Sequence, residues 1–130
     1  MSNFKIGDAL IRIKNASIVG KSSTTVPKSK YVLGMLKVLK NYGFIKDFSE
    51  SAESKYEYSV ELAYDAKGRA KVTNVKLFSK PGRHLYMKAK ELKPSRSGTA
   101  LSLISTTAGV MAYASAKKQN LGGEIICEIW

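Results

Sequence analysis

Residues 101–130 read LSLISTTAGVMAYASAKKQNLGGEIICEIW, and the chain is organised around this stretch. An apolar strand beginning at Leu101 ends in three consecutive hydroxyl residues, which are Ser105, Thr106 and Thr107. Each hydroxyl offers one donor and two acceptor lone pairs on a short side chain, which suits sugar hydroxyls, phosphate oxygens and exposed base edges. Either these groups face a ligand, or one of them simply caps a following helix.

The composition of 109–119 predicts that helix. If it begins at Thr107 or Ala108, the unpaired N–H groups of its first turn would face the same way as the hydroxyls and favour an anion. The glycines that follow it, Gly122 and Gly123, permit a positive φ and close approach of two backbone segments, so we expect a turn into a last strand, 124–130.

Glu124 begins that last strand, directly after the glycine pair. Its carboxylate can accept hydrogen bonds from base amino groups or orient neighbouring hydroxyls. The alternative is a solvated turn residue that contacts no ligand.

The first 79 residues predict an N-terminal unit with the element order α-β-α-β-β-β. Ile6, Leu10 and Ile13 have helical spacing, with Asp8 expected in the first turn. A short strand at 24–26 is stopped by Pro27. Further elements are a helix at 30–42 capped by Ser29 and ended by Gly43, a hairpin of strands at 44–48 and 56–62, a turn at 65–68, and a strand at 72–78. We expect the two helices to cover one apolar face of the sheet.

A Pro-Gly turn in 80–83 marks the predicted boundary between two subdomains, 1–79 and 80–130. A short strand at 84–88 and a basic linker at 88–98, predicted to be mobile in isolation, precede the C-terminal stretch. The predicted fold class is therefore α+β, with two small α/β subdomains, of which the second is mostly β with one short helix.

The net charge of +12 and the pI near 9.8 indicate a polyanionic partner. The charge is unevenly placed, because residues 1–49 carry +7, 50–65 carry −4, 66–98 carry +9 and 99–130 are neutral. The two basic blocks would supply sequence-independent attraction to phosphate, whereas the neutral C-terminal stretch would act through hydrogen bonds and shape. The acidic block is expected to face away from nucleic acid.

The sequence does not support an enzyme. Ser105 lacks the Gly-x-Ser-x-Gly setting of a nucleophile, and His84, the one histidine, stands beside Arg83 as an expected surface group. Cys127, the one cysteine, is expected to be a small buried apolar residue. We expect no metal, no cofactor and no small-molecule substrate.

No window contains the roughly 20 apolar residues that a membrane helix requires. The first residues also lack the apolar region of a secretory signal. We therefore expect a cytoplasmic protein without a membrane partner.

The pattern Ile104-Ser105-Thr106-Thr107 with Gly109-Val110-Met111, followed by residues 122–127, closely resembles the C-terminal signature of the bacterial family of small ribosomal subunit protein eight. Segments 8–15, 27–30, 43–45 and 80–82 resemble the same family in order and spacing, so the likeness covers almost the whole chain. Residues 108, 112 and 115–119 depart from it, since Ala108 and Ala112 replace a basic residue and a hydroxyl of many relatives, and relatives have more arginine in the last helix.

The resemblance implies a primary binder of the central domain of small-subunit ribosomal RNA that acts early in assembly and also represses translation of its own messenger RNA. It implies protein five of the small subunit as a neighbour. The RNA-binding residues that it implies are Ser105, Thr106, Thr107, Gly122, Gly123, Glu124, Tyr86, Arg12, Asn15, Ser29 and Lys30, to which the basic linker adds Lys88. The alternative is a generic module for double-stranded RNA or an architectural DNA-binding protein, which would depend mainly on lysine and arginine.

Overall fold

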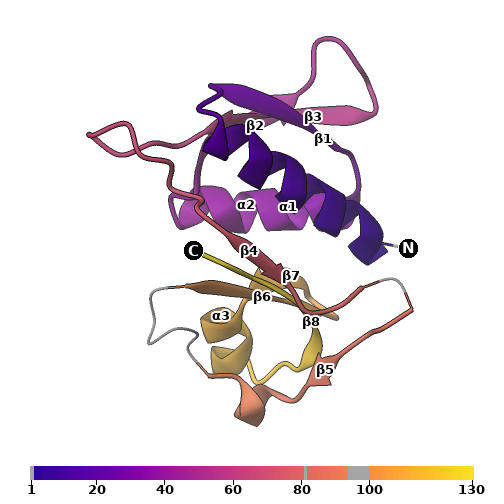
Figure 1. Ribbon diagram of the computed structural model, residues 1–130. Coiled ribbons are helices and arrows are strands. Elements are labelled where there is room, and N and C mark those ends of the chain that lie inside the picture. Colours follow the sequence, from indigo (N-terminus) through magenta and orange to yellow (C-terminus); the bar gives the residue numbers. More distant parts are fainter. Residues whose placement is uncertain (1, 81, 94–99) are drawn as a thin grey trace.

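The computed structural model describes residues 2–80, 82–93 and 100–130, with side chains from Lys5 onward (Figure 1). Pro81 of the predicted turn and residues 94–98 of the predicted linker lie outside this part. The described chain is an α+β protein with two antiparallel sheets, as predicted. No helix in the described residues is long and apolar enough to cross a membrane.

The N-terminal elements form one helical layer against a three-stranded sheet with the order β1-β3-β2. Their bounds are α1 (Ser2–Ile18), β1 (Ser23–Pro27), α2 (Lys30–Asn41), β2 (Ile45–Glu50) and β3 (Glu57–Leu62). The prediction for α2 is confirmed at both ends: the Ser29 hydroxyl accepts a hydrogen bond from the Val32 amide at 3.0 Å, and Gly43 follows the helix with φ +81°. The predicted hairpin is confirmed by the pairing of β2 with β3.

The first helix is longer than predicted. Because α1 starts at Ser2 and runs to Ile18, Asp8 does not lie in its first turn and Arg12 lies before its last turn, whereas Asn15 lies in the last turn, where its carbonyl accepts a hydrogen bond from the Val19 amide at 3.3 Å. Asp8 instead pairs with Arg12 one turn later, with Oδ1 3.3 Å from Nε.

The second sheet has the order β4-β8-β6-β7, and β5 also pairs with β8. The elements here are β4 (Val75–Leu77), β5 (Tyr86–Met87), the 3₁₀ helix η1 (Ala89–Glu91), β6 (Leu101–Thr106), β7 (Gly109–Ala112), α3 (Tyr113–Lys118) and β8 (Gly123–Ile129). The strand predicted at 72–78 therefore does not extend the N-terminal sheet. Val75 and Leu77 instead pair with β8 and pack on the main core. A division of the chain into folding units at residue 79 stays a prediction.

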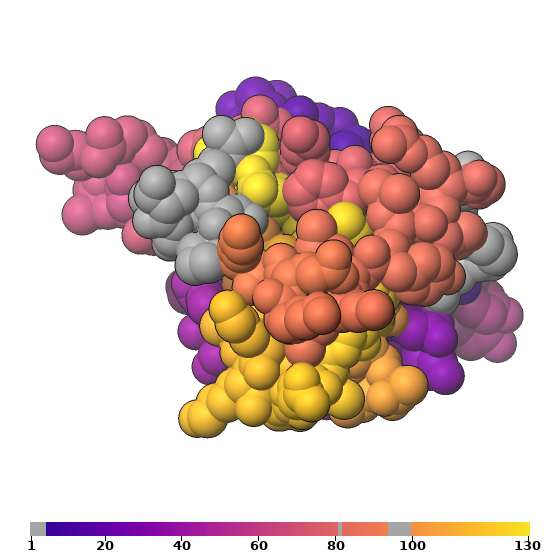
Figure 2. All heavy atoms as spheres, turned by 90° about the horizontal axis from the view of Figure 1, so that it is seen from below, coloured from indigo at the N-terminus to yellow at the C-terminus, as the bar shows by residue number. Residues whose placement is uncertain are grey.

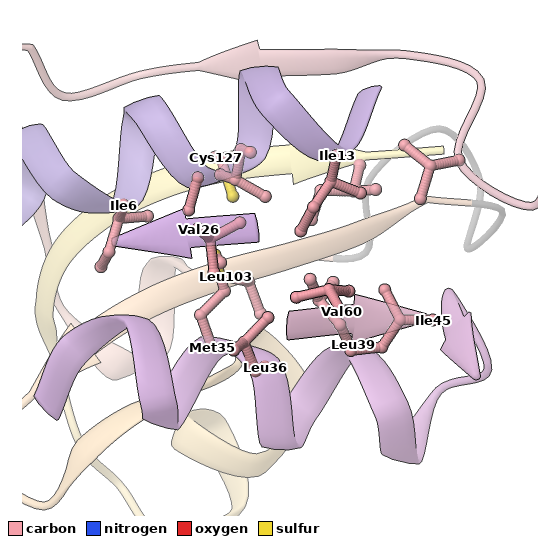
Figure 3. Close-up of a cluster of buried hydrophobic side chains, with 14 of the residues drawn as sticks. Ile6, Ile13, Val26, Met35, Leu36, Leu39, Ile45, Val60, Leu103 and Cys127 are labelled. Atoms are coloured by element: carbon pink, nitrogen blue, oxygen red, sulfur yellow. The ribbon is translucent and has the colours of Figure 1, made fainter. Parts of the chain in front are cut away.

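The main core is enclosed by the two N-terminal helices, the N-terminal sheet, which contributes Val26, Ile45 and Val60, and one face of the second sheet (Figure 3). Ile6 and Ile13 from α1 and Met35, Leu36 and Leu39 from α2 meet Leu103 of β6 and Cys127 of β8 there. A smaller core on the other face of the sheet contains Leu92, Ile104, Ala116 and Ile125. Strand β8 has a bulge here, since Leu103 pairs with Cys127 but Ile104 pairs with Ile125. The extra residue, Ile126, belongs to the main core together with Cys127.

The predicted helix at 109–119 is wrong over its first part. Residues 109–112 form β7, which pairs with β6 through the two-residue turn at Thr107 and Ala108. The helix begins only at Tyr113, so its first turn offers no N–H groups beside the hydroxyls. Pairing with β6 makes this segment a strand, and Gly109 and Val110 are themselves weak helix formers.

Residues 88–93 of the predicted mobile linker pack against the protein. Ala89 begins η1, Leu92 is completely buried in the smaller core, and the Glu91 carboxylate accepts a hydrogen bond from the Lys88 amide at 2.8 Å. The apolar side chains of Ala89 and Leu92 hold this segment against the protein.

Candidate nucleic-acid interface

One cross-strand row of residues runs along an end of the second sheet. Tyr86 of β5 is the register partner of Glu124 of β8, Glu124 is also the partner of Ser105 of β6, and Ser105 is the partner of Val110 of β7. Side chains of directly opposite residues lie on the same face of a sheet. The fold therefore brings together a phenol, a carboxylate and a hydroxyl from three separate segments of the chain.

The row continues onto the N-terminal layer through Gly34 of α2. A side-chain carbon on Gly34 would lie 3.4 Å from Cβ of Val110, so α2 and β7 are in close contact. Ser29 and Lys30 stand about one helical turn before this contact, at the start of α2. These two predicted RNA contacts thus lie one turn of α2 from the end of the row.

Gly122 and Gly123 are required by close packing. A Cβ on Gly122 would lie 2.7 Å from the carbonyl oxygen of Met87, and one on Gly123 would lie 2.0 Å from that of Ser105. Neither glycine has a positive φ; that conformation falls on Asn120, with φ 57°, directly after α3. The predicted close approach is confirmed, and the predicted positive φ is not found at the glycine pair.

Thr106 uses its hydroxyl within the turn between β6 and β7. Its Oγ1 accepts a hydrogen bond from the Ala108 amide at 3.1 Å and donates one to the Gly109 carbonyl at 2.9 Å. Thr107 is exposed at the tip of this turn, while Ser105 is half-buried in the row. The three hydroxyls therefore differ in their bonding within the protein. The Thr106 hydroxyl stabilises the turn, whereas those of Ser105 and Thr107 do not.

Glu124 is hydrogen-bonded to His84, which was predicted to be a surface group. Nδ1 of His84 lies 2.6 Å from Oε2 of Glu124, and the side chains are 28% and 15% exposed. The pair follows from the strand register, which the sequence does not show: His84 precedes Tyr86 by two residues, and Tyr86 faces Glu124 across the strands.

A shallow groove of about 650 Å³ borders the row. It is lined by Tyr86, Met87, Lys88, Ala89, Lys90, Glu91, Asn120, Gly122 and Gly123. The segment 82–93 lies on the surface beside the C-terminal residues, as the orange and yellow atoms of Figure 2 show. Tyr86 is 70% exposed here, and Lys88 is exposed as well, so an aromatic face and a cation flank the glycine pair.

Arg12 and Asn15, the other two predicted contacts, lie on α1. Arg12 bridges to the N-terminal sheet, because Nη1 lies 3.1 Å from Oε2 of Glu57. Asn15 is exposed. No contact joins either residue to the row, and their role in RNA binding stays a prediction.

Part of the acidic block neutralises the first basic block. Glu57 pairs with Arg12, and Glu50 pairs with Lys28. Lys30 and Lys88, in contrast, form no ion pair within the described residues, although the ammonium of Lys30 lies 5.2 Å from the ring centroid of Tyr31. Their charges are therefore available to an external anion.

The described residues contain no group of three histidine, cysteine or acidic side chains that could hold a metal ion. Cys127 is buried, as predicted, and its burial raises the pKa of the thiol far above the ordinary value. This thiol is consequently a poor nucleophile.

The fold and the row define a basic α+β protein that presents hydroxyls, a carboxylate and an aromatic ring beside free lysines, which is a surface chemistry suited to folded nucleic acid. The model of the family described as ribosomal protein S8 matches residues 5–130. The chain belongs to this family of ribosomal proteins. Its members are structural proteins that bind ribosomal RNA, and the family is not enzymatic.

Three relatives illustrate the similarity. Small ribosomal subunit protein uS8 of Helicobacter pylori (strain G27) is 41% identical over 131 residues, covering 100% of both chains. The protein of the same name from Helicobacter acinonychis (strain Sheeba) is also 41% identical over 131 residues with full coverage. That of Nostoc punctiforme is 38% identical over 131 residues, covering 99% of this chain and 98% of the relative.

Proposed function

We propose that this protein is a structural component of the small ribosomal subunit and a primary binder of the central domain of its ribosomal RNA, acting early in assembly. The single observation that carries the proposal is the cross-strand row of Tyr86, Glu124 and Ser105, which is bordered by a close-packed glycine pair. The relatives from Helicobacter pylori and Nostoc punctiforme are small ribosomal subunit proteins, which supports the ribosomal setting.

Recognition would divide between two kinds of contact. The row and the exposed Thr107 would meet RNA through short hydrogen bonds and stacking on Tyr86, which suits the 2′-hydroxyls and unstacked bases of an irregular helix. Lys30 and Lys88 would attract phosphates without regard to sequence. Because Gly123 lacks a side chain, RNA could approach the backbone of the strand end closely.

The family resemblance also supports a second role, a neighbour and a location. Repression of the protein's own messenger RNA would require a transcript that folds into the same irregular shape, and so would use the same residues. Protein five of the small subunit is the proposed neighbour, and the ribosome in the cytoplasm is the proposed location.

The decisive experiment is to crosslink the protein to total cellular RNA and to sequence what is attached. We expect a peak in the central domain of small-subunit ribosomal RNA, with a weaker peak in the protein's own messenger. Ser105→Ala serves as the matched variant, because it leaves every lysine in place and should lower the peak while keeping the background. Crosslinks spread evenly over unrelated duplex RNA would instead support a generic binding module.

A further inference from the structure

The hydrogen-bonded pair of His84 and Glu124 has no part in the division of contacts proposed above. It follows from the fold, because the pairing of β5 with β8 sets Tyr86 opposite Glu124 and brings His84, two residues earlier, to the same carboxylate. Ser79 anchors the adjoining loop, since its buried hydroxyl donates to the Ile125 carbonyl at 2.6 Å and accepts from the Leu85 amide at 3.2 Å. The backbone on both sides of the pair is thus fixed.

The pair uses one oxygen of the carboxylate. Within the described residues, His84 is the hydrogen-bonding partner of Glu124 and occupies Oε2. No buried side-chain oxygen or nitrogen there lacks a partner, so Oε1 of Glu124 is reachable from outside. The imidazole therefore holds the carboxylate in place and leaves one acceptor for a ligand.

A free glutamate would make a poor element of an RNA-binding surface. Its flexible side chain loses rotamer freedom on binding, and its negative charge is repelled by phosphate. A partly buried imidazole removes the first cost by fixing the side chain in advance, and when protonated it also offsets the charge.

We propose that His84 is a positioning residue for RNA recognition, which fixes the Glu124 carboxylate and makes the affinity of the row depend on the charge of the imidazole. This inference rests on the proposed function, since it requires that Glu124 meet RNA. His84 acts through Glu124 and need not touch RNA itself.

The surroundings identify the imidazole as the group that would respond to pH. The other titratable or charged groups on the strands around the pair are Tyr86 on β5, Lys76 on β4, Cys127 and Glu128 on β8, and Lys80 and Arg83 in the preceding turn. The strands β6 and β7 bring none. Of these side-chain types, only imidazole ordinarily changes charge between pH 5 and 8.

A double-mutant cycle tests whether His84 acts through Glu124. His84→Ala and Glu124→Gln should each weaken binding of a central-domain RNA fragment by about threefold to tenfold, and the double variant should bind no more weakly than Glu124→Gln alone. Arg83→Ala is the matched control, because it removes a neighbouring cation whose effect should multiply with that of Glu124→Gln. Multiplying effects of His84→Ala and Glu124→Gln would overturn the proposal.

A pH series gives an independent readout. Affinity of the wild type should rise by about threefold to tenfold from pH 8 to pH 5.5, whereas His84→Arg, which keeps a donor and a fixed charge, should remain tight and flat, and His84→Gln flat and weaker. A wild-type slope retained in His84→Arg would overturn the proposal. These two variants keep a donor, so they serve even if His84→Ala does not fold.

The two proposals fail in different ways. If Ser105→Ala and Glu124→Gln both bind the fragment as the wild type does, the proposed function of the row is wrong. If Glu124→Gln weakens binding and His84→Ala does not, only the role of His84 is wrong.

Discussion

A side-chain carbon on Gly123 would lie 2.0 Å from the carbonyl oxygen of Ser105. Non-bonded carbon and oxygen atoms do not approach so closely. The atoms that this carbon would meet belong to the backbone of Ser105 and Thr106, which cannot rotate away as a side chain can. The pairing of β6 with β8 at the row therefore depends on the absence of a side chain at residue 123.

We expect Gly123→Ala to lower the free energy of unfolding by at least about 2 kcal/mol, because the strands must separate to admit the methyl group. Chemical denaturation followed by circular dichroism measures this. Gly34→Ala is the matched control, because Gly34 lies within α2 and its added methyl would lie 3.4 Å from Cβ of Val110. The higher helix propensity of alanine should raise the free energy of unfolding by as much as about 1 kcal/mol. An unchanged midpoint for Gly123→Ala would contradict the close packing.

Ser105→Ala should weaken binding of the central-domain fragment by about 1 to 3 kcal/mol without changing the salt slope, since a desolvated partner loses its hydrogen bond. Filter binding over a salt series measures both quantities. Equal affinity of variant and wild type would remove Ser105 from the interface.

Thr106→Ala should lower both RNA affinity, again by about 1 to 3 kcal/mol, and stability, because the hydroxyl bonds Ala108 and Gly109 in the turn. Thr106→Ser, which keeps the hydroxyl, is the control and should keep the turn. Thermal unfolding beside filter binding separates the two effects. A Thr106→Ala protein with native stability would show that the turn does not need this hydroxyl.

Lys30→Ala and Lys88→Ala should each reduce the slope of log affinity against log salt by about 0.7 to 1, and weaken cognate and random RNA alike. Lys40→Ala is the control, because Nζ of Lys40 is 3.0 Å from Oδ1 of Asp47 and is already paired within the protein. A change in discrimination between the two RNAs, with the slope unaltered, would show that these lysines read structure.

Alkaline pH should destabilise the fold through Cys127. Burial raises the pKa of this thiol above its ordinary 9.0, so above pH 9 the unfolded chain releases a proton that the folded chain keeps. Below pH 9 the thiol leaves the free energy of unfolding unchanged. Above pH 9 the free energy of unfolding falls by about 1.4 kcal/mol per pH unit. Burial also raises the pKa of Tyr113 to about 12, which extends the loss above pH 10.

Urea unfolding at pH 8 and pH 10.5 measures this effect. Cys127→Ala should lose less stability between the two pH values than the wild type does. The same loss in both proteins would assign the alkaline sensitivity to other groups.

The N-terminal elements could be predicted because their signals are local. The stripe of Val32, Met35, Leu36 and Leu39 and the cap at Ser29 lie within one helix, and each is found as expected. Strand partners are not local: nothing near Val75 indicates that it pairs with Ile129. Residues 109–112 directly precede the residues of α3, and their pairing with β6 through a tight turn makes them a strand.

The candidate site was predictable as a set of residue types and not as an arrangement. Hydroxyls and a glycine pair stand out in the sequence, whereas the contact of His84 with Glu124 depends on a two-residue strand whose register no local pattern specifies. The same limit applies to Thr106, whose hydroxyl is engaged by a turn that the predicted helix would have removed.

Strand β8 connects the completeness of the main core to the formation of the row. Tyr86, Ser105 and Glu124 reach one another only when β8 has paired on both sides, and Ile126, Cys127 and Ile129 of the same strand close the main core. A chain with an incomplete core cannot present the row, so it would keep only its nonspecific attraction to phosphate. Binding of RNA to the row would in turn stabilise the complete fold by mass action. The RNA would thereby select finished protein molecules from a mixed population.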